Sequence, residues 1–456
     1  MLHRIVVAVS IVFGLVGCGG GSGDAPAAGT PSTNTNSPWG NSSLASRQAH
    51  YKNYNAVMLH RVHPRAPNEV PNHWPMGSFL DVFEQQGKLK ARFLYLSLPS
   101  QDRNEQFFDI IGDEHVYVDS RYPRTILNPI GPFLASPQVN RGDYQNEAFL
   151  TGQGEPRVMW SFINDSQVNQ SGYTFPSSLG NGGGELKVGF VNGGATRLEH
   201  VADTFYGFGC SEYNKRVEDA WMFKPDFQIL QMAPVFLYDT LAPVIEANLL
   251  NGRFAPASCA STSNTEHGVL LSYAYSLDPA NDAPQKRGRI ALVRYDGNQF
   301  QLLGKTAIQS DFIAVDQIPA LRILQDSLTP QQPYVISMQG RQLTVYQLNG
   351  NTLERRFGTT VNSGNTQDQA KIWLRQQLMV MHGGKLIIHP PTSSTNDWYY
   401  ANQDGALQPY KRGLLTENFD SLTMMKSVGG KLYVGVRHVE EKPYRHDIGE
   451  LIRIDE

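Results

Sequence analysis

Short apolar runs separated by turn residues dominate the chain after residue 46. The runs are rich in Val, Ile, Leu, Tyr and Phe, and Gly, Asn, Asp or Pro bound each of them. Such runs predict β-strands, and no segment carries the long 3.6-residue period of an amphipathic helix. We therefore expect residues 47–456 to form an all-β domain.

The clearest strands lie near the C-terminus. Two apolar runs flank a His-Gly-Gly turn, and two more flank Asp-Gly, a dipeptide that favours a tight turn because the turn needs positive φ. The four runs are 377–381, 385–390, 398–403 and 406–410. One structural unit is thus four consecutive strands joined by alternating short and longer connections.

The four-strand unit recurs along the chain. Its expected third strands end at Asp119, Gly193, Asp239, Asp296, Asn349, Asp404 and Asp455. Successive positions are 46 to 57 residues apart, except for an interval of 74 residues that contains a Gly-rich insertion. A repeat of this length, with four antiparallel strands in each copy, resembles the blades of a β-propeller.

The resemblance implies a seven-bladed propeller over residues 47–456. The last repeat stops after its third strand, and the apolar run 55–64 can supply the fourth, so we expect an N-terminal strand to close the ring. Eight blades, if residues 131–200 hold two of them, and a pair of β-sandwiches remain alternatives. The repeats carry no motif of one particular propeller family, so the resemblance implies an architecture and no specific activity.

Residues 1–17 have the pattern of a secretion leader. A short basic start precedes an uncharged run over residues 5–17, which is too short to span a bilayer. The run ends in Leu15-Val16-Gly17-Cys18, which resembles the lipobox of bacterial lipoproteins. That resemblance implies cleavage before Cys18, acylation of its thiol and its new amine, and, with Gly19 in second place, an outer-membrane location on either side. An ordinary secretory leader with a chance cysteine is the alternative.

Residues 18–46 combine the lipidated cysteine with a stretch rich in Gly, Ser, Thr, Asn and Pro, which predicts a flexible tether. The formal net charge of −3 argues against a polybasic nucleic-acid-binding protein. Hydrophobic residues make up 40% of the chain, enough to build a core and too many for a disordered tail.

Two cysteines remain after lipidation. Cys210 and Cys259 are 49 residues apart, close to one repeat, so both should lie near equivalent connections of adjacent blades. An exported protein meets an oxidising compartment, which makes a disulfide between them plausible. Two buried free thiols are the alternative.

Two segments carry candidate binding residues. One is an aromatic loop that contains Trp398, Tyr399 and Tyr400, which suits sugar stacking or a protein contact. The other is a loop of the last repeat that contains His438, Glu440, Glu441, His446 and Asp447. Packing within a blade is the alternative for the first loop, and a solvated loop is the alternative for the second.

No catalytic residue, metal site or cofactor is predicted. His60, His63 and His73 cluster in sequence, but residues three apart on a strand face opposite sides, so His60 and His63 do not easily bind one ion. The expected function is a membrane-anchored platform whose rim binds a protein or glycan of the cell envelope. A propeller hydrolase or lyase that acts on polysaccharide, and a structural spacer, are the alternatives.

Overall fold

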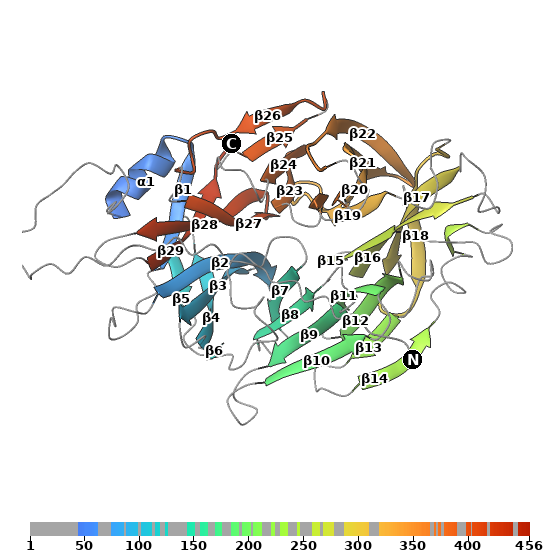
Figure 1. Cartoon of the computed structure of the whole chain (residues 1–456), viewed down its shortest axis with the longest axis horizontal. Coiled ribbons are helices and arrows are strands. Elements are labelled where there is room, and N and C mark those ends of the chain that lie inside the picture. The colour runs from blue at the N-terminus through green and yellow to red at the C-terminus, as the bar shows by residue number, and fades with distance from the viewer. Residues whose placement is uncertain are drawn as a thin grey trace, which may run out of the picture. The chain divides into compact units, whose positions relative to one another are not determined.

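The computed structural model describes the chain from Leu44 onward in separate segments (Figure 1). For most strands before Ser258 only the backbone is described. The described residues are 44–62, 74–85, 88–98, 102–111, 115–118, 124–125, 144–150, 156–162, 169–175, 184–190, 194–201, 204–211, 220–223, 229–235, 244–246, 258–264, 268–277, 287–309, 319–364, 369–370, 373–374, 378–389, 398–402, 404–416, 420–440 and 446–456.

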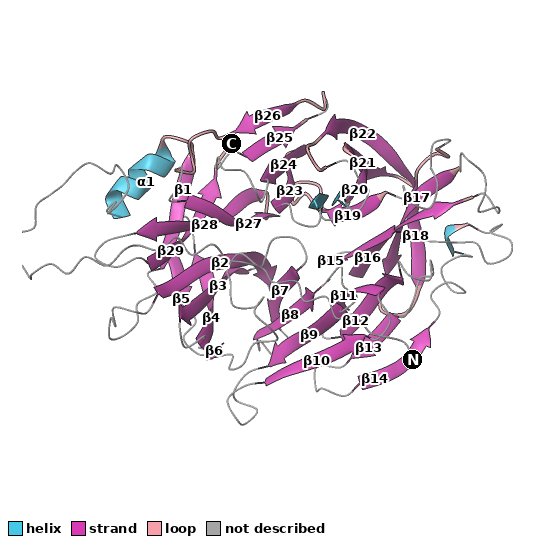
Figure 2. Cartoon of the chain, viewed as in Figure 1, coloured by secondary structure: helices cyan, strands magenta, loops and turns pink. Residues whose placement is uncertain are grey.

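Antiparallel four-stranded groups follow one another along the first half of the chain (Figure 2). The first group contains β2 (Trp74–Gln85), β3 (Lys88–Leu98), β4 (Asp102–Ile111) and β5 (His115–Val118), with β6 (Arg124–Thr125) also paired to β4. The second contains β7 (Tyr144–Leu150), β8 (Pro156–Phe162), β9 (Asn169–Phe175) and β10 (Gly184–Phe190). The third contains β11 (Gly194–Val201), β12 (Thr204–Ser211), β13 (Ala220–Phe223) and β14 (Ile229–Val235).

The same arrangement continues to the C-terminus. The fourth group contains β15 (Ser258–Asn264), β16 (Gly268–Ser276), β17 (Gly288–Tyr295) and β18 (Phe300–Lys305). The fifth contains β19 (Ala320–Leu324), β20 (Tyr334–Gln339), β21 (Gln342–Asn349) and β22 (Thr352–Thr360), and one parallel pair, Lys305 with Thr352, joins it to the fourth. The sixth contains β23 (Leu378–His382), β24 (Lys385–His389), β25 (Trp398–Ala401) and β26 (Leu407–Tyr410).

The last group combines both ends of the described chain. It contains β27 (Asp420–Val428), β28 (Lys431–Glu440) and β29 (His446–Ile454), and β1 (Ala56–Val62) is its fourth strand. β1 runs antiparallel to β29, from Ala56 opposite Ile454 to Val62 opposite Gly449. A backbone hydrogen bond from the amide of Asp455 to the carbonyl of Asn55, 2.8 Å long, extends the pairing beyond the strand ends.

Neighbouring groups contact one another in chain order, through their first strands except at the step from the second group to the third, where β11 contacts β8 and β9. β2 contacts β7, β11 contacts β8, β9 and β15, β15 contacts β19, β19 contacts β23, β23 contacts β27, and β27 contacts β2 again. Four-stranded antiparallel sheets stacked face to face in this order give a propeller-like all-β fold.

Apolar side chains fill the spaces between consecutive groups. One cluster joins Leu270 and Ile290 to Leu321 and Val335, and the next joins Ile336 and Val345 to Met379 and Leu386. The following clusters join Ile387 to Leu422 and Val434, and Met424 and Leu451 to Phe79 and Val82. Among the described side chains, the fifth, sixth and last sheets therefore bury one face against the group before them and the other against the group after them.

The repeat pattern locates the third strands correctly in the C-terminal half and wrongly before it. Asp296, Asn349, Asp404 and Asp455 follow or end the third strands β17, β21, β25 and β29. The strands before Asp119 and Gly193 are β5 and β10, which are fourth strands, and Asp239 lies outside the described residues. The error arises because third and fourth strands have the same apolar pattern, and unequal connections shift the repeat.

One α-helix precedes β1. α1 (Leu44–Lys52) places Arg47 and Tyr51, four residues apart, on one buried face. α1 begins inside the stretch 18–46 that was predicted as a tether, so regular structure starts before residue 47. Tertiary contacts of this face stabilise the helix, because an isolated nine-residue helix is marginal in water.

Two glycines of the predicted tight turns have positive φ, and only one of them is crowded. Gly405 has a φ of +73°, and a Cβ there would lie 2.3 Å from the carbonyl oxygen of Gly358. Gly350 has a φ of +57°, and a Cβ there would meet no atom within 4 Å.

Alanine substitution is expected to destabilise the protein to different extents at Gly350 and Gly405. Gly350→Ala should lower the free energy of unfolding by about 1–2 kcal/mol through the positive φ alone. Gly405→Ala should cost more, because the backbone at Gly358 must also move. Urea unfolding of both variants measures the difference, and equal losses would contradict the crowding at Gly405.

Candidate functional site

The predicted aromatic loop is a strand of the core. Trp398, Tyr399 and Tyr400 lie on β25, and the Trp398 side chain is 1% exposed. The Trp398 ring meets the Tyr410 ring edge to face, with ring centroids 4.9 Å apart. Tyr399 and Tyr400 are half-buried, and the Tyr400 hydroxyl donates to Gln408 Oε1 at 2.7 Å. For Trp398 the structure thus supports the alternative of packing within a blade, because alternation along the strand turns this side chain into the core.

The second predicted loop is largely a β-hairpin. β28 continues to Glu440 and β29 begins at His446, and these two residues are paired across the hairpin. The loop is therefore shorter than predicted, because both strands extend several residues further than expected. Glu441 and the side chains of Glu440, His446 and Asp447 lie outside what the structure describes.

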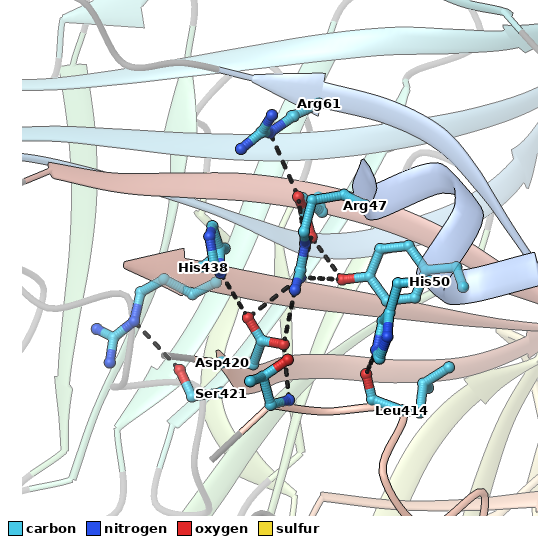
Figure 3. Close-up of polar contacts among 11 residues, drawn as sticks. Arg47, His50, Arg61, Leu414, Asp420, Ser421 and His438 are labelled. Carbon is cyan, nitrogen blue, oxygen red and sulfur yellow. Dashed lines mark hydrogen bonds and ion pairs between the residues drawn. The ribbon is translucent and has the colours of Figure 1, made fainter. Parts of the chain in front are cut away.

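His438 of that segment belongs to a fully buried polar cluster, which we call the N-terminal clasp (Figure 3). The clasp consists of Arg47, Tyr51, Asp420, His438 and Glu450, which come from α1, β27, β28 and β29. Four of these five residues were not singled out from the sequence.

Arg47 occupies the centre of the clasp. Its Nη1 and Nη2 atoms each donate to a carboxylate oxygen of Asp420 at 3.1 Å. Its Nε donates to Glu450 Oε1 at 3.2 Å, and its Nη2 donates to Glu450 Oε2 at 2.5 Å. One guanidinium group thus binds two carboxylates, a geometry that its planar fork of donors allows and a lysine ammonium does not.

The remaining lone pairs of the two carboxylates are also occupied. His438 Nδ1 donates to Asp420 Oδ1 at 2.7 Å, and the backbone amide of Thr416 donates to Asp420 Oδ2 at 2.8 Å. The Tyr51 hydroxyl donates to Glu450 Oε2 at 2.5 Å, and Arg61 of β1 forms an ion pair with Glu450 Oε1 at 3.3 Å. Two guanidinium groups therefore balance two carboxylates in a region that excludes water.

The electrostatics of the clasp keep Asp420 ionised. Burial by itself raises the pKa of Asp420, but the hydrogen bond from His438 and the positive charge of Arg47 outweigh burial, so the pKa lies below its usual value. The pKa of Tyr51 is raised well above its usual value by burial and by the negative charges of Glu450 and Asp420. Tyr51 therefore stays protonated and acts as a donor.

The clasp fixes α1 beside the connection between β26 and β27. On the same helix as Arg47, His50 Nε2 lies 2.9 Å from the carbonyl oxygen of Leu414. Lys411 Nζ donates to the carbonyl oxygen of Tyr54 at 2.9 Å, just after the helix. The arrangement is suited to holding the N-terminal segment in place, since its charged groups are buried and already paired.

The other predicted sites have no described geometry. Cys210 lies in β12 and Cys259 in β15, so both are in strands and not in connections, and their side chains are outside the described residues. His60 is on β1, where burial lowers its pKa, whereas His63 and His73 lie outside the described residues. Within the described segments, no group of three or more His, Cys, Asp or Glu side chains is arranged to hold a metal ion.

Removing the central guanidinium should destabilise the protein strongly. Arg47→Ala leaves Asp420 and Glu450 buried with reduced compensation, which should lower the free energy of unfolding by about 3–5 kcal/mol. Urea unfolding followed by tryptophan fluorescence measures this loss. Lys52→Ala, at an exposed position of the same helix, is the matched control and should leave stability unchanged. Similar behaviour of the two variants would contradict the role of Arg47.

The lowered pKa of Asp420 predicts a dependence of stability on acid. Its contribution is present above the ordinary aspartate pKa of about 3.9 and is lost as pH falls through the lower folded-state pKa. Unfolding midpoints of the wild-type protein and of Asp420→Asn, measured from neutral pH down to about pH 2.5, should therefore converge as pH falls. A difference that stays constant over this range would show that ionised Asp420 contributes nothing to the clasp.

Comparison with known proteins leaves the family open. No family model matches the chain, and no curated protein matches it. A prolyl endopeptidase structure is similar at 11% identity and a TM-score of 0.38, covering 86% of this chain and 48% of that one, so the chain spans about half its length. The β-propeller domain of the Trilobed protease from Pyrococcus furiosus is similar at 9% identity and a TM-score of 0.37, covering 82% of this chain and 93% of that one. A fucose-specific lectin from Aleuria aurantia is similar at 8% identity and a TM-score of 0.34, covering 84% of this chain and 96% of that one. Likeness at this level carries no functional argument, so function rests on this chain's own residues.

Proposed function

We propose that the protein is a lipid-anchored binding platform of the bacterial cell envelope, built on a seven-bladed propeller that β1 closes, and that its partner is a protein. Two features support the blade number and the closure. The described strands form seven four-stranded groups, and neighbouring groups contact one another in an order that returns from β27 to β2. The last group obtains its fourth strand from the N-terminal side of the chain.

The observation that carries the proposal is that two clasp residues belong to α1. In the sequence, the stretch predicted as a tether runs into this helix, which carries Arg47 and Tyr51. Tension on the tether would therefore act on a helix held by Arg47 and Tyr51 and on a strand paired along β29. Such an attachment suits a domain that is held at a membrane while it binds something else.

The lipobox-like sequence Leu15-Val16-Gly17-Cys18 supplies the proposed anchor, and Gly19 favours the outer membrane. None of the helices in the described segments is long and apolar enough to cross a bilayer. The proposed disulfide between Cys210 and Cys259 agrees with contact between the strands that carry them, β12 and β15.

A protein partner is favoured over a glycan by the burial of Trp398. Sugar stacking needs an exposed aromatic face, and the Trp398 ring is packed against Tyr410 inside the sheet. The hydrolase alternative needs carboxylates from different blades that converge on substrate. Asp420 and Glu450, which do converge, belong to one sheet and are fully buried against Arg47.

The anchor is tested by detergent-phase partition and by the mass of the N-terminal peptide. We expect the wild-type protein to enter the detergent phase and to carry acyl chains on Cys18, and Cys18→Ser to lose both. Cys259→Ser is the matched control, because it removes a thiol outside the lipobox and should retain the anchor. Unchanged partition of Cys18→Ser would refute the lipoprotein proposal.

The platform is tested by cross-linking in the intact envelope. We expect the full-length protein to capture one envelope protein, whose binding is saturable when both components are purified. Absence of any saturable partner would overturn the proposal. Release of reducing ends from envelope polysaccharide by the purified protein would instead favour the hydrolase alternative.

A further inference from the structure

The ends of three first strands carry a second polar cluster. Asp326 and Ser327 follow β19, His382 is the last residue of β23, and Ser427 is the second-last residue of β27. Asp420, in the clasp, is the first residue of β27, so clasp and cluster lie at opposite ends of that strand, about 20 Å apart at the rise of a β-strand.

Asp326 fixes the connection between β19 and β20 to the next group. It is 1% exposed, and its Oδ1 accepts a hydrogen bond from the amide of Leu328 at 3.0 Å. Its Oδ2 accepts a second bond, 2.9 Å long, from the amide of Gly384 in the β23–β24 turn. One buried carboxylate thus shapes its own turn and holds the neighbouring turn.

Ser327 forms hydrogen bonds with the last group, which follows the group that Asp326 contacts. Its Oγ accepts a hydrogen bond from the amide of Gly430, in the β27–β28 turn, at 2.9 Å. Its Oγ is 2.6 Å from Ser427 Oγ, and its own amide donates to Ser427 Oγ at 3.3 Å. Ser427 Oγ is also 2.9 Å from His382 Nδ1. When Ser327 donates its hydroxyl proton to Ser427, the Ser427 proton is directed to His382 Nδ1.

The connection also covers this cluster with an apolar side chain. Leu328 is 53% exposed, and its Cδ2 would lie 3.1 Å from a Cβ added at Gly430. A Cβ added at Gly383 would lie 4.0 Å from Leu328 Cδ1. Glycine at position 430 therefore lets Leu328 approach the β27–β28 turn closely, whereas a side chain at position 383 would only be in ordinary van der Waals contact with it.

The connection is ordered by its own backbone bonds. The amide of Thr329 donates to the carbonyl of Asp326 at 2.9 Å, and the amide of Gln332 donates to the carbonyl of Thr329 at 2.9 Å. The amide of Leu348 donates to the carbonyl of Pro333 at 3.0 Å. Two successive turns thus hold the segment in one shape above the strand ends.

We propose that residues 325–333 form a strap that crosses from the β19–β22 group over the β23–β24 turn to the β27–β28 turn, and that opening of the strap exposes His382, whose side chain is 4% exposed, and uncovers the partly exposed Ser427 further. The strap links groups that are not consecutive in the chain, which the repeat alone does not provide. This inference goes beyond the proposed function, and it needs neither the lipid anchor nor the partner.

Thiol labelling tests the strap in the full-length chain. Ser427→Cys should react slowly with a bulky maleimide, and adding Asp326→Ala, which removes the charged acceptor without touching residue 427, should speed labelling about tenfold. Mass spectrometry of the peptide that contains residue 427 separates it from the native cysteines. Ser421→Cys, near the other end of β27, is the matched control and should react equally with and without Asp326→Ala. Equal labelling of Cys at 427 in both backgrounds would overturn the strap.

Hydrogen exchange provides a test that does not need a thiol. In the unmodified protein, the Gly384 and Gly430 amides should be protected because Asp326 and Ser327 accept their hydrogen bonds. Ser327→Ala should speed exchange at Gly430 about tenfold and leave the amides at the start of β27 unchanged. Rapid exchange of Gly430 in the unmodified protein, or no change in Ser327→Ala, would contradict the proposal.

Discussion

The position of α1 depends on one buried guanidinium group that two carboxylates share. Taking Arg47, Asp420 and Glu450 out of water costs several kcal/mol for each charge, and only close pairing offsets that cost. The pairing succeeds because His438, Tyr51, Thr416 and Arg61 provide further partners for the same carboxylate oxygen atoms. In this placement of α1 both carboxylates and the guanidinium group of Arg47 are paired at once, so the cluster specifies where the helix binds.

Local signals in the sequence account for the hairpins of the C-terminal half. The His-Gly-Gly and Asp-Gly turns were predicted because they need positive φ, and the strands around them, β23 to β26, form as expected. The assignment of third strands failed where connections vary in length, as before Gly193. A strand's order within its sheet depends on its neighbours, and its own residues do not encode that order.

The clasp was not predictable in the same way. Arg47 and Glu450 are 403 residues apart, and no local pattern connects them. Arg47 lies in a polar stretch that continues the composition of the tether, so neither its burial nor the helix was expected. The strap was missed for a related reason, because Asp326 and Ser327 look like ordinary turn residues until the turns of two other groups are placed beside them. Trp398 shows the opposite error, in which an apparent surface aromatic is a core residue.

The pairing of β1 with β29 imposes an order on folding. β1 leaves a ribosome early, whereas its partner strand lies within the last eleven residues of the chain. Until those residues arrive, β1 has an unpaired edge, and Arg47 has neither carboxylate. Contacts of such large sequence separation form slowly and leave strand edges available for wrong pairing. A chain that stops short of β29 would therefore lack the partner strand of β1 and expose an edge prone to association, so synthesis of β29 controls when the last sheet can form.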